Sequence, residues 1–204
     1  MKISIIDCGL GNINSISKCV EKLGFAYEII KEPNSLNNAS KIIFPGVGSF
    51  PKAMDTIHSN GWYSILIKKI VDEKIKYLGI CLGMQLLADF GLEFKKIQGL
   101  SIINGTVERI DNFGCKQSIP HIGWNDVSVK RNNQLFEGVK NNTDFYFDHS
   151  FSINCSNKED IIATTYHDVN IVAAINRDNI FGTQFHPEKS SEGGKQLLYN
   201  FLKI

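Results

Sequence analysis

The stretch Lys76–Leu87 constrains the fold of this chain more than any other part. A short apolar run leads into Gly79-Ile80-Cys81-Leu82-Gly83, and the segment Met84–Asp89 that follows is helix-like. This pattern is typical of a nucleophile elbow, in which a buried parallel strand delivers one residue to a tight turn and a helix starts directly afterwards. The turn crowds the backbone, so glycine is needed on both sides of the delivered residue.

A cysteine in such a turn gains three properties. Cys81 is expected at the carboxyl edge of the sheet, where the N-terminus of the next helix favours its thiolate over its thiol. The backbone N–H of Leu82 is expected to point to where an oxyanion forms. A cysteine between two glycines can also be a buried packing residue, and this stretch alone leaves both interpretations open. A nucleophile requires a base, an orienting group and a second oxyanion donor elsewhere in the chain.

Length and composition favour one globular domain. The 204 residues fit a single domain, 1–204, and the net charge of +1 gives no reason to expect a nucleic-acid partner. The apolar run Met1–Ile6 is too short for a signal peptide or a membrane span. The five cysteines form no Cys-x-x-Cys pair, so we expect no metal site, no disulfide framework and a reducing cytoplasm.

The first part of the chain alternates predicted strands and helices, which is the pattern of βαβ units. We predict strands at 2–7, 26–30 and 41–44, and helices at 13–23, 51–57 and 63–72. The turn Gly9-Leu10-Gly11-Asn12 lacks the third glycine of a dinucleotide-binding fingerprint, so we interpret it as a structural turn at the edge of the sheet.

The loop Pro45-Gly46-Val47-Gly48 follows a predicted strand and precedes a predicted helix. Its glycines leave several backbone N–H groups open, so Val47 and Gly48 are candidates for an oxyanion site. Taken alone, the loop is interpreted more simply as a plain turn. In a doubly wound sheet, however, such loops gather at one edge, where binding sites form.

Short β-like runs dominate from Gly99 to Ile180, separated by turns rich in asparagine and glycine. We predict strands at 101–107, 127–130, 143–151, 161–166 and 171–176, a last strand at 180–185 and a closing helix at 193–202. The sequence therefore predicts an α/β fold with a doubly wound, mostly parallel central sheet and added antiparallel strands.

The last predicted strand runs into His186-Pro187-Glu188. Pro187 keeps its predecessor out of the helical region, so His186 is expected to be extended. In an extended segment residues two apart share a face, so Glu188 is expected beside the imidazole, where it fixes the tautomer and supports the cation. With Cys81 and the glycine loop, these residues supply a nucleophile, a base, an orienting group and oxyanion donors.

Two further segments gather polar and aromatic residues. In Pro120-His121-Ile122-Gly123-Trp124-Asn125 we interpret His121 as a structural polar residue. In the aromatic strand 145–151, the pattern alone leaves open whether His149 and Ser150 are structural or functional.

Together these motifs resemble the class I, triad-type glutamine amidotransferases over almost the whole chain. Within that class they resemble the glutaminase subunits of imidazole glycerol phosphate synthase, chiefly through Pro120–Asn125 and the compact length. The other matching segments are Gly9–Asn12, Pro45–Gly48, Gly79–Gln85, Tyr146–Ser150 and Gly182–Ser190. Two positions depart from the usual pattern: Cys8 stands where an aromatic residue is usual, and Phe151 where tyrosine is frequent.

The resemblance implies a flavodoxin-like fold, a glutaminase mechanism without a cofactor, and roles for specific residues. Its implied catalytic residues are Cys81, His186 and Glu188, with Leu82 and either Val47 or Gly48 as oxyanion donors. The implied glutamine-binding residues are Gln85, Glu93, His149, Ser150 and Phe151.

The resemblance also implies a heterodimer. The partner is a cyclase subunit with a (βα)₈ barrel, which receives ammonia from glutamine and uses it in histidine biosynthesis. The residues that match the partner contact or the ammonia passage are Trp124, Tyr146 and Lys189. We further hypothesise that the loop 45–49 completes the oxyanion site only when the partner binds.

Two other functions share parts of this pattern. The same glutaminase chemistry can supply ammonia for amidino-sugar synthesis on surface glycans, again with a cyclase-like partner. A flavodoxin-like protease, deglycase or chaperone with a cysteine elbow would share Cys81, but neither the terminal His-Pro-Glu nor the segment 120–125.

Overall fold

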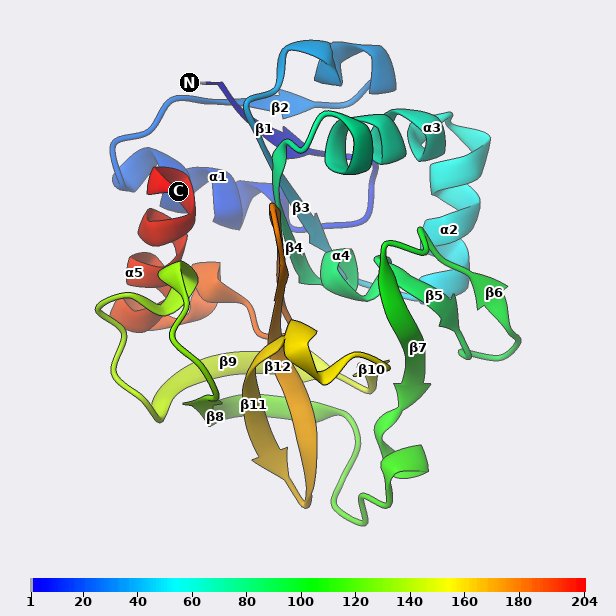
Figure 1. Ribbon diagram of the computed structural model, residues 1–204, viewed down its shortest axis with the longest axis vertical. Helices are drawn as coiled ribbons and strands as arrows, with labels where there is room; N and C mark the ends of the chain where they lie inside the picture. The colour runs from blue at the N-terminus through cyan, green and yellow to red at the C-terminus, as the bar shows by residue number, and fades with distance from the viewer. Residues whose placement is uncertain (1) are drawn as a thin grey trace.

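The computed structural model describes residues 2–204, so Met1 of the predicted domain 1–204 lies outside the described residues. The chain forms a nine-stranded sheet, ordered β2-β1-β3-β4-β13-β12-β11-β8-β9, and a four-stranded sheet, ordered β10-β7-β5-β6 (Figure 1). The strands are β1 (Ile3–Ile6), β2 (Tyr27–Ile30), β3 (Lys41–Gly46), β4 (Lys76–Cys81), β5 (Ala88–Gly91), β6 (Ile97–Gln98), β7 (Ile103–Arg109), β8 (His121–Val129), β9 (Thr143–His149), β10 (Phe151–Cys155), β11 (Ile161–His167), β12 (Val169–Arg177) and β13 (Ile180–Thr183). The α-helices are α1 (Ile13–Lys22), α2 (Phe50–Ser59), α3 (Trp62–Ile67), α4 (Leu82–Gln85) and α5 (Ser191–Lys203).

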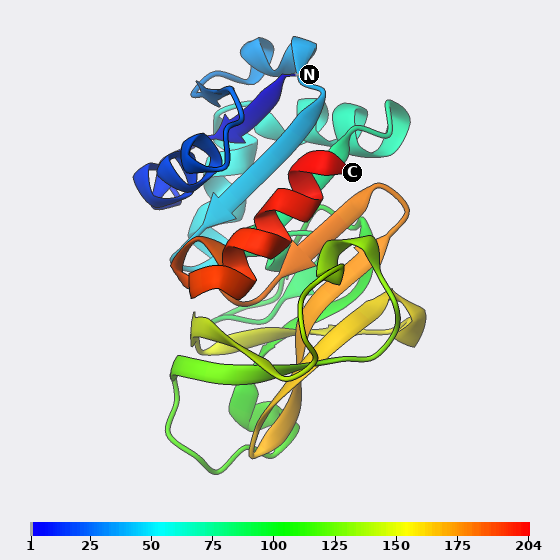
Figure 2. The same ribbon diagram turned by 90° about the vertical axis from the view of Figure 1, so that its left-hand side faces the viewer.

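The parallel half of the large sheet is covered by helices on both faces, as the two views show (Figures 1 and 2). Helices α1 and α5 pack on one face, and α2 and α3 pack on the other. Strand β3 shows why: Ile43 joins the core with α1 and α5, whereas Ile42 and Phe44 join the core with α2 and α3. Successive side chains of a strand point to opposite faces, so a strand with apolar residues in a row must be covered on both.

Strands β2, β1, β3, β4 and β13 run parallel, and β12, β11, β8 and β9 extend the sheet in antiparallel fashion. The predicted fold class, a mostly parallel doubly wound sheet with added antiparallel strands, is therefore confirmed. In the second sheet one added pair, β5 with β7, is parallel.

The predicted helical segment Met84–Asp89 is wrong. Helix α4 is a single turn, and the chain then enters strand β5 of the second sheet. The carbonyls of Leu86 and Leu87 accept hydrogen bonds from Leu100 and Ile103, at 2.8 and 2.9 Å, instead of from the next helical turn. These partners are remote in sequence, so local pattern gives no sign of them.

The closing helix, predicted at 193–202, is confirmed as α5. Its apolar side chains Leu197, Leu198 and Leu202 are buried. The ammonium of Lys41, at the start of β3, donates to the carbonyls of Phe201 and Leu202 and so satisfies the C-terminal end of the helix. Within residues 2–204, no helix has the length and apolar character needed to span a bilayer.

Candidate active site

Cys81 ends β4 in a left-handed backbone conformation, with φ 54° and ψ −111°. A residue with a Cβ is strained in this region, and such strain concentrates at functional sites. The glycines on either side are required by contact, because a Cβ on Gly79 would overlap the Gly83 carbonyl and a Cβ on Gly83 would overlap the Phe44 carbonyl. The predicted strand and tight turn around Cys81 are therefore present in the structure.

Replacing Gly83 by alanine is expected to reduce the free energy of unfolding by at least about 3 kcal/mol, because the added methyl meets rigid backbone. A matched control is Gly24→Ala, where the glycine has φ +83° but open space around it. That control should lose only about 1–2 kcal/mol through backbone strain. Urea unfolding of both variants measures the difference, and equal losses would contradict the packing argument.

The helix that follows Cys81 stabilises a negative charge on the sulfur less than the elbow pattern predicts. Because α4 has one turn, its dipole is small and can do little for a charge at Cys81. Leu82 is the first residue of α4, where a backbone N–H has no acceptor within the helix. Its N–H therefore remains a candidate oxyanion donor.

His186 and Glu188 lie beyond the end of β13, the strand next to β4. His186 Nδ1 is 2.9 Å from Glu188 Oε1, and the two side chains are 4% and 3% exposed. His186 is extended as predicted, with φ −98° and ψ 96°. Glu188, however, lies in the 3-10 turn η6 (Pro187–Lys189), so the contact arises from this turn and not from strand alternation.

The surroundings of His186 favour its cation. Burial lowers the pKa of His186, but the neighbouring Cys81 and Glu188 side chains outweigh burial and raise the pKa to about 10. His186 Nε2 and Glu188 Oε2 are buried and have no hydrogen-bond partner among the described residues. The Nε2 atom is therefore free to exchange a proton with the thiol and with a bound substrate.

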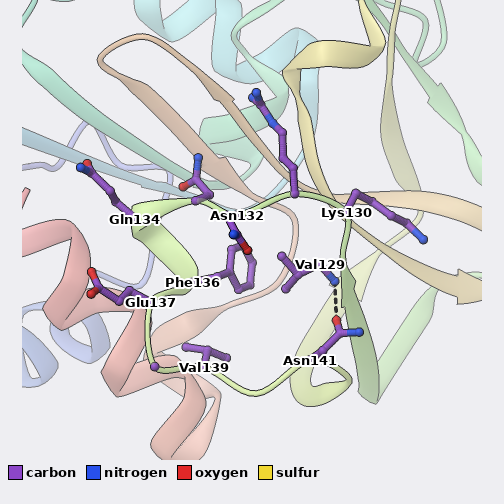
Figure 3. Close-up of a pocket in the computed structure, with 11 residues that line it drawn as sticks. Val129, Lys130, Asn132, Gln134, Phe136, Glu137, Val139 and Asn141 are labelled. Carbon is purple, nitrogen blue, oxygen red and sulfur yellow. Dashed lines mark hydrogen bonds between the residues drawn. The ribbon is translucent and has the colours of Figure 1, made fainter.

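Cys81 opens into a pocket of about 310 Å³, large enough for an amino acid. Every residue predicted to bind glutamine or an oxyanion lines it. The lining residues are Val47, Gly48, Cys81, Leu82, Gln85, Glu93, Pro120, Asp148, His149, Ser150 and Phe151. A larger hollow of about 730 Å³ is lined by residues of the segment 129–141 (Figure 3), but its lining contains no cysteine, serine or histidine.

Two of the predicted glutamine-binding side chains are also held by the protein. Glu93 Oε2 accepts a hydrogen bond from the N–H of Phe50 at 2.8 Å, at the start of α2. Gln85 Nε2 donates to the Phe151 carbonyl at 2.8 Å and to Gln184 Oε1 at 3.0 Å. These bonds use both amide protons of Gln85, so its Oε1 is the atom that remains available to a ligand.

The glycine loop is close to Cys81, but one of its two candidate donors is engaged. The N–H of Val47 donates to the Leu10 carbonyl in the turn after β1. Gly48 is in a left-handed conformation, with φ +106°. In this conformation Val47 is not free to bind an oxyanion, and a rotation of the peptide would have to release it.

The three residues predicted at a partner contact or ammonia passage form a cluster. The rings of Trp124 and Tyr146 meet edge to face with centroids 6.2 Å apart. Lys189 Nζ lies 5.2 Å from the centre of the Tyr146 ring. Trp124 is 52% exposed on β8.

His121 is a buried structural residue, as predicted, but it is joined to the site. Its Nδ1 is 3.0 Å from His149 Nε2, and His149 Nδ1 is 2.9 Å from the Phe151 carbonyl. The pairing of β8 with β9 brings these two histidines opposite each other. His149 thus lines the pocket while its ring supports the backbone at Phe151.

Sequence reasoning missed Gln184. Its Nε2 lies 3.6 Å from Cys81 Sγ, and the residue is fully buried. A signal was present, because Gln184 and His186 are two apart in a segment expected to be extended and so share a face.

Comparisons with known proteins agree with this geometry. Residues 4–204 match the family model described as glutamine amidotransferase class-I. The chain is 42% identical over 201 residues to the imidazole glycerol phosphate synthase subunit HisH 2 of Methanococcus maripaludis, covering 98% of both chains. It is 39% identical to the subunit HisH of Pelagibacter ubique, covering 100% of both.

Solved structures show the same fold at lower identity. A glutamine amidotransferase from Thermotoga maritima superposes with a TM-score of 0.72 at 16% identity, covering 100% of this chain and 96% of that one. The chain is an enzyme that belongs to the class I glutamine amidotransferases and, within them, to the HisH subunits of imidazole glycerol phosphate synthase.

Proposed function

We propose that this chain hydrolyses glutamine to glutamate and ammonia and delivers the ammonia to a cyclase subunit for imidazole glycerol phosphate synthesis. The observation that carries the proposal is the placement of Cys81. It is held in a left-handed conformation beside the buried His186–Glu188 pair, and it lines a pocket of amino-acid size. The full-length identity to HisH subunits supports the pathway.

In the proposed first step, the Cys81 thiolate adds to the side-chain carbonyl carbon of glutamine. The oxyanion that forms is held by the N–H of Leu82 and by an N–H of the loop at Val47 or Gly48. His186, cationic because its pKa is about 10, gives its Nε2 proton to the departing nitrogen. The carbon–nitrogen bond breaks, ammonia leaves, and a glutamyl thioester remains on Cys81.

In the second step, neutral His186 takes a proton from water as the water oxygen attacks the thioester carbon. The carbon–sulfur bond breaks, its electron pair returns to Cys81 as thiolate, and glutamate is released. Glu188 holds the Nδ1 proton of His186 in both steps, so Nε2 remains the reacting nitrogen.

Free glutamine carries an α-ammonium and an α-carboxylate, and the pocket has partners for both. We assign Glu93 and the Oε1 atom of Gln85 to the ammonium, because these are acceptors at the pocket wall. The backbone of His149, Ser150 and Phe151 supplies the remaining polar contacts.

We propose that the cyclase partner is a (βα)₈ barrel and that it docks over Trp124, Tyr146 and Lys189. Ile122, 58% exposed, lies two residues before Trp124 on β8 and so shares its face of the strand, which gives this face further apolar surface. We also propose one domain over 1–204 and a cytoplasmic location. Free thiols at all five cysteines suit a reducing compartment.

A glutaminase that acts without its partner would waste glutamine. The hydrogen bond that engages the Val47 N–H supports regulation of the activity by this loop. We propose that partner docking shifts the loop toward a conformation in which the bond from Val47 to Leu10 is broken and the oxyanion site is complete. A structure of the lone chain with two loop N–H groups already directed at the site would contradict this.

The test measures glutamate release from glutamine by the chain alone, with a histidine-pathway cyclase subunit, and with that subunit plus its ribotide substrate. We expect strong stimulation by the substrate-bound cyclase and no release by the control Cys81→Ala. Amide-¹⁵N-glutamine, supplied with excess unlabelled ammonium, should leave its label in the product if the ammonia passes directly between subunits.

Each other outcome would contradict part of the proposal. Stimulation only by a cyclase encoded beside sugar-modifying enzymes would retain the glutaminase and replace the pathway with amidino-sugar synthesis. No glutaminase activity with any such partner would refute the amidotransferase function, and a protease, deglycase or chaperone would then be the leading alternative.

A further inference from the structure

Gln184 is a buried residue outside the triad whose side chain contacts the sulfur of Cys81. It follows the end of β13, and its backbone N–H is fixed by a 2.8 Å bond to the Ala173 carbonyl on β12. Its side chain is fully buried, and its Nε2 lies 3.6 Å from Cys81 Sγ, within the range of a hydrogen bond to sulfur.

The orientation of the Gln184 amide is fixed, through Gln85, by the backbone carbonyl of Phe151. The Phe151 carbonyl can only accept, so Gln85 must turn its NH₂ group toward it. The second proton of that NH₂ group then meets Gln184 Oε1 at 3.0 Å. With its oxygen facing Gln85, Gln184 must present its own NH₂ group to Cys81. A flip of the Gln85 amide would oppose two acceptors, and a flip of the Gln184 amide would oppose two donors.

The hydrogen bond from the Gln184 amide stabilises the Cys81 thiolate more than the thiol. Besides Gln184, the Asp148 carbonyl lies 4.0 Å from Cys81 Sγ, where it can accept from the thiol. Ionisation removes that interaction, because a thiolate has no proton to donate. The N–H of Gln184, in contrast, becomes a charge-assisted donor and binds more strongly. The amide therefore favours the ionised sulfur.

We propose that Gln184 is a further catalytic residue, whose amide stabilises the Cys81 thiolate, and that Gln85 is the positioning residue that orients that amide. The inference rests on the proposed function and deepens it. The thiolate exists twice in the reaction, before it attacks glutamine and when it leaves the thioester, and Gln184 acts at both points. Because the side chain of Gln184 is neutral, this donor adds no charge that would oppose the His186 cation.

The experiment is alkylation of Cys81 by iodoacetamide as a function of pH, on the full chain. Peptide mapping follows Cys81 separately from the partly exposed Cys8 and Cys19. In Gln184→Met, which keeps the length of the side chain and removes the amide, the midpoint of the pH–rate profile should rise by about one pH unit. Below the midpoint the alkylation rate should fall about tenfold.

Thr183→Val is the matched control. Thr183 is the preceding residue, is fully buried, and donates to the Phe185 carbonyl at 3.0 Å, so its replacement disturbs the same segment but not the sulfur. Its midpoint should equal that of the wild type. A second variant, Gln184→Glu, keeps the shape and replaces the donor by a carboxylate, and its midpoint should also rise.

An unchanged midpoint in a folded Gln184→Met or Gln184→Glu chain would overturn the inference, as would an equal rise in Thr183→Val. Alkylation requires neither glutamine nor a partner. A chain that shows the shift but has no glutaminase activity with any cyclase partner would therefore retain this role of Gln184 and refute the proposed function, and the opposite result would do the reverse.

Discussion

Replacing His186 by asparagine is expected to lower kcat for glutamine hydrolysis by the partner-bound enzyme by about 10²- to 10⁴-fold, the contribution of a positioned general acid and base. His186 must give a proton to ammonia and later take one from water, and asparagine can do neither at neutral pH. The loss should be in kcat more than in KM, because His186 is not among the residues that line the glutamine pocket.

The stability of this variant separates chemistry from folding. The side chains of His186 and Glu188 are 4% and 3% exposed. Asparagine can still donate a hydrogen bond to Glu188 through its NH₂ group, so the buried carboxylate keeps a partner. Urea unfolding should show a native-like transition. As a control, His58→Gln removes an exposed histidine on α2 and should retain full activity. A loss below tenfold in His186→Asn would mean that another group moves the proton.

The part of the site that the sequence predicts best is the part that local backbone geometry decides. Gly79, Cys81 and Gly83 lie within one turn, and the contacts that require glycine are formed within that turn and with the adjacent strand β3. The His186–Glu188 contact was also predicted, although the structure forms it through the turn η6 and not through an extended strand. Because His186 and Glu188 are only two residues apart, few backbone conformations keep their side chains from meeting.

The features that the sequence did not predict depend on contacts between distant segments. The segment Met84–Asp89 looks helical, but its carbonyls pair with residues 100–103 and draw it into a second sheet. The bond between His121 and His149 depends on the register of β8 on β9, which no local pattern specifies. The bond from Val47 to Leu10 likewise joins two loops on separate strands.

The His121–His149 pair should make the protein sensitive to mild acid. Burial lowers the pKa of His149 to about 3 and, with the neighbouring His167, that of His121 to about 4. The hydrogen bonds show why the rings stay neutral. The Phe151 carbonyl accepts a hydrogen bond from the Nδ1–H of His149, and the unprotonated Nε2 of His149 accepts one from the Nδ1–H of His121. A further proton on His149 Nε2 would face a donor.

The direction of the pH effect follows from proton binding. Below about pH 6.5 the unfolded chain protonates these histidines, whereas the native chain does not until pH approaches 4 or 3. Their contribution to stability is therefore full above pH 6.5 and is lost as pH falls below it. Between pH 6.5 and 5 the loss should be about 2 kcal/mol for each histidine. His186, whose pKa is raised to about 10, loses its contribution only above pH 6.5.

Urea unfolding between pH 7.5 and 5 measures this loss above the range where carboxylates titrate. His121→Gln should be less stable than the wild type at pH 7.5 but should show a flatter dependence on pH, because one titrating group is gone. His58→Gln keeps the buried pair and should retain the full dependence. If the wild type keeps the same free energy of unfolding from pH 7.5 to 5, the histidines are not held neutral by their burial. If His121→Gln is as acid-sensitive as the wild type, the sensitivity arises elsewhere in the chain.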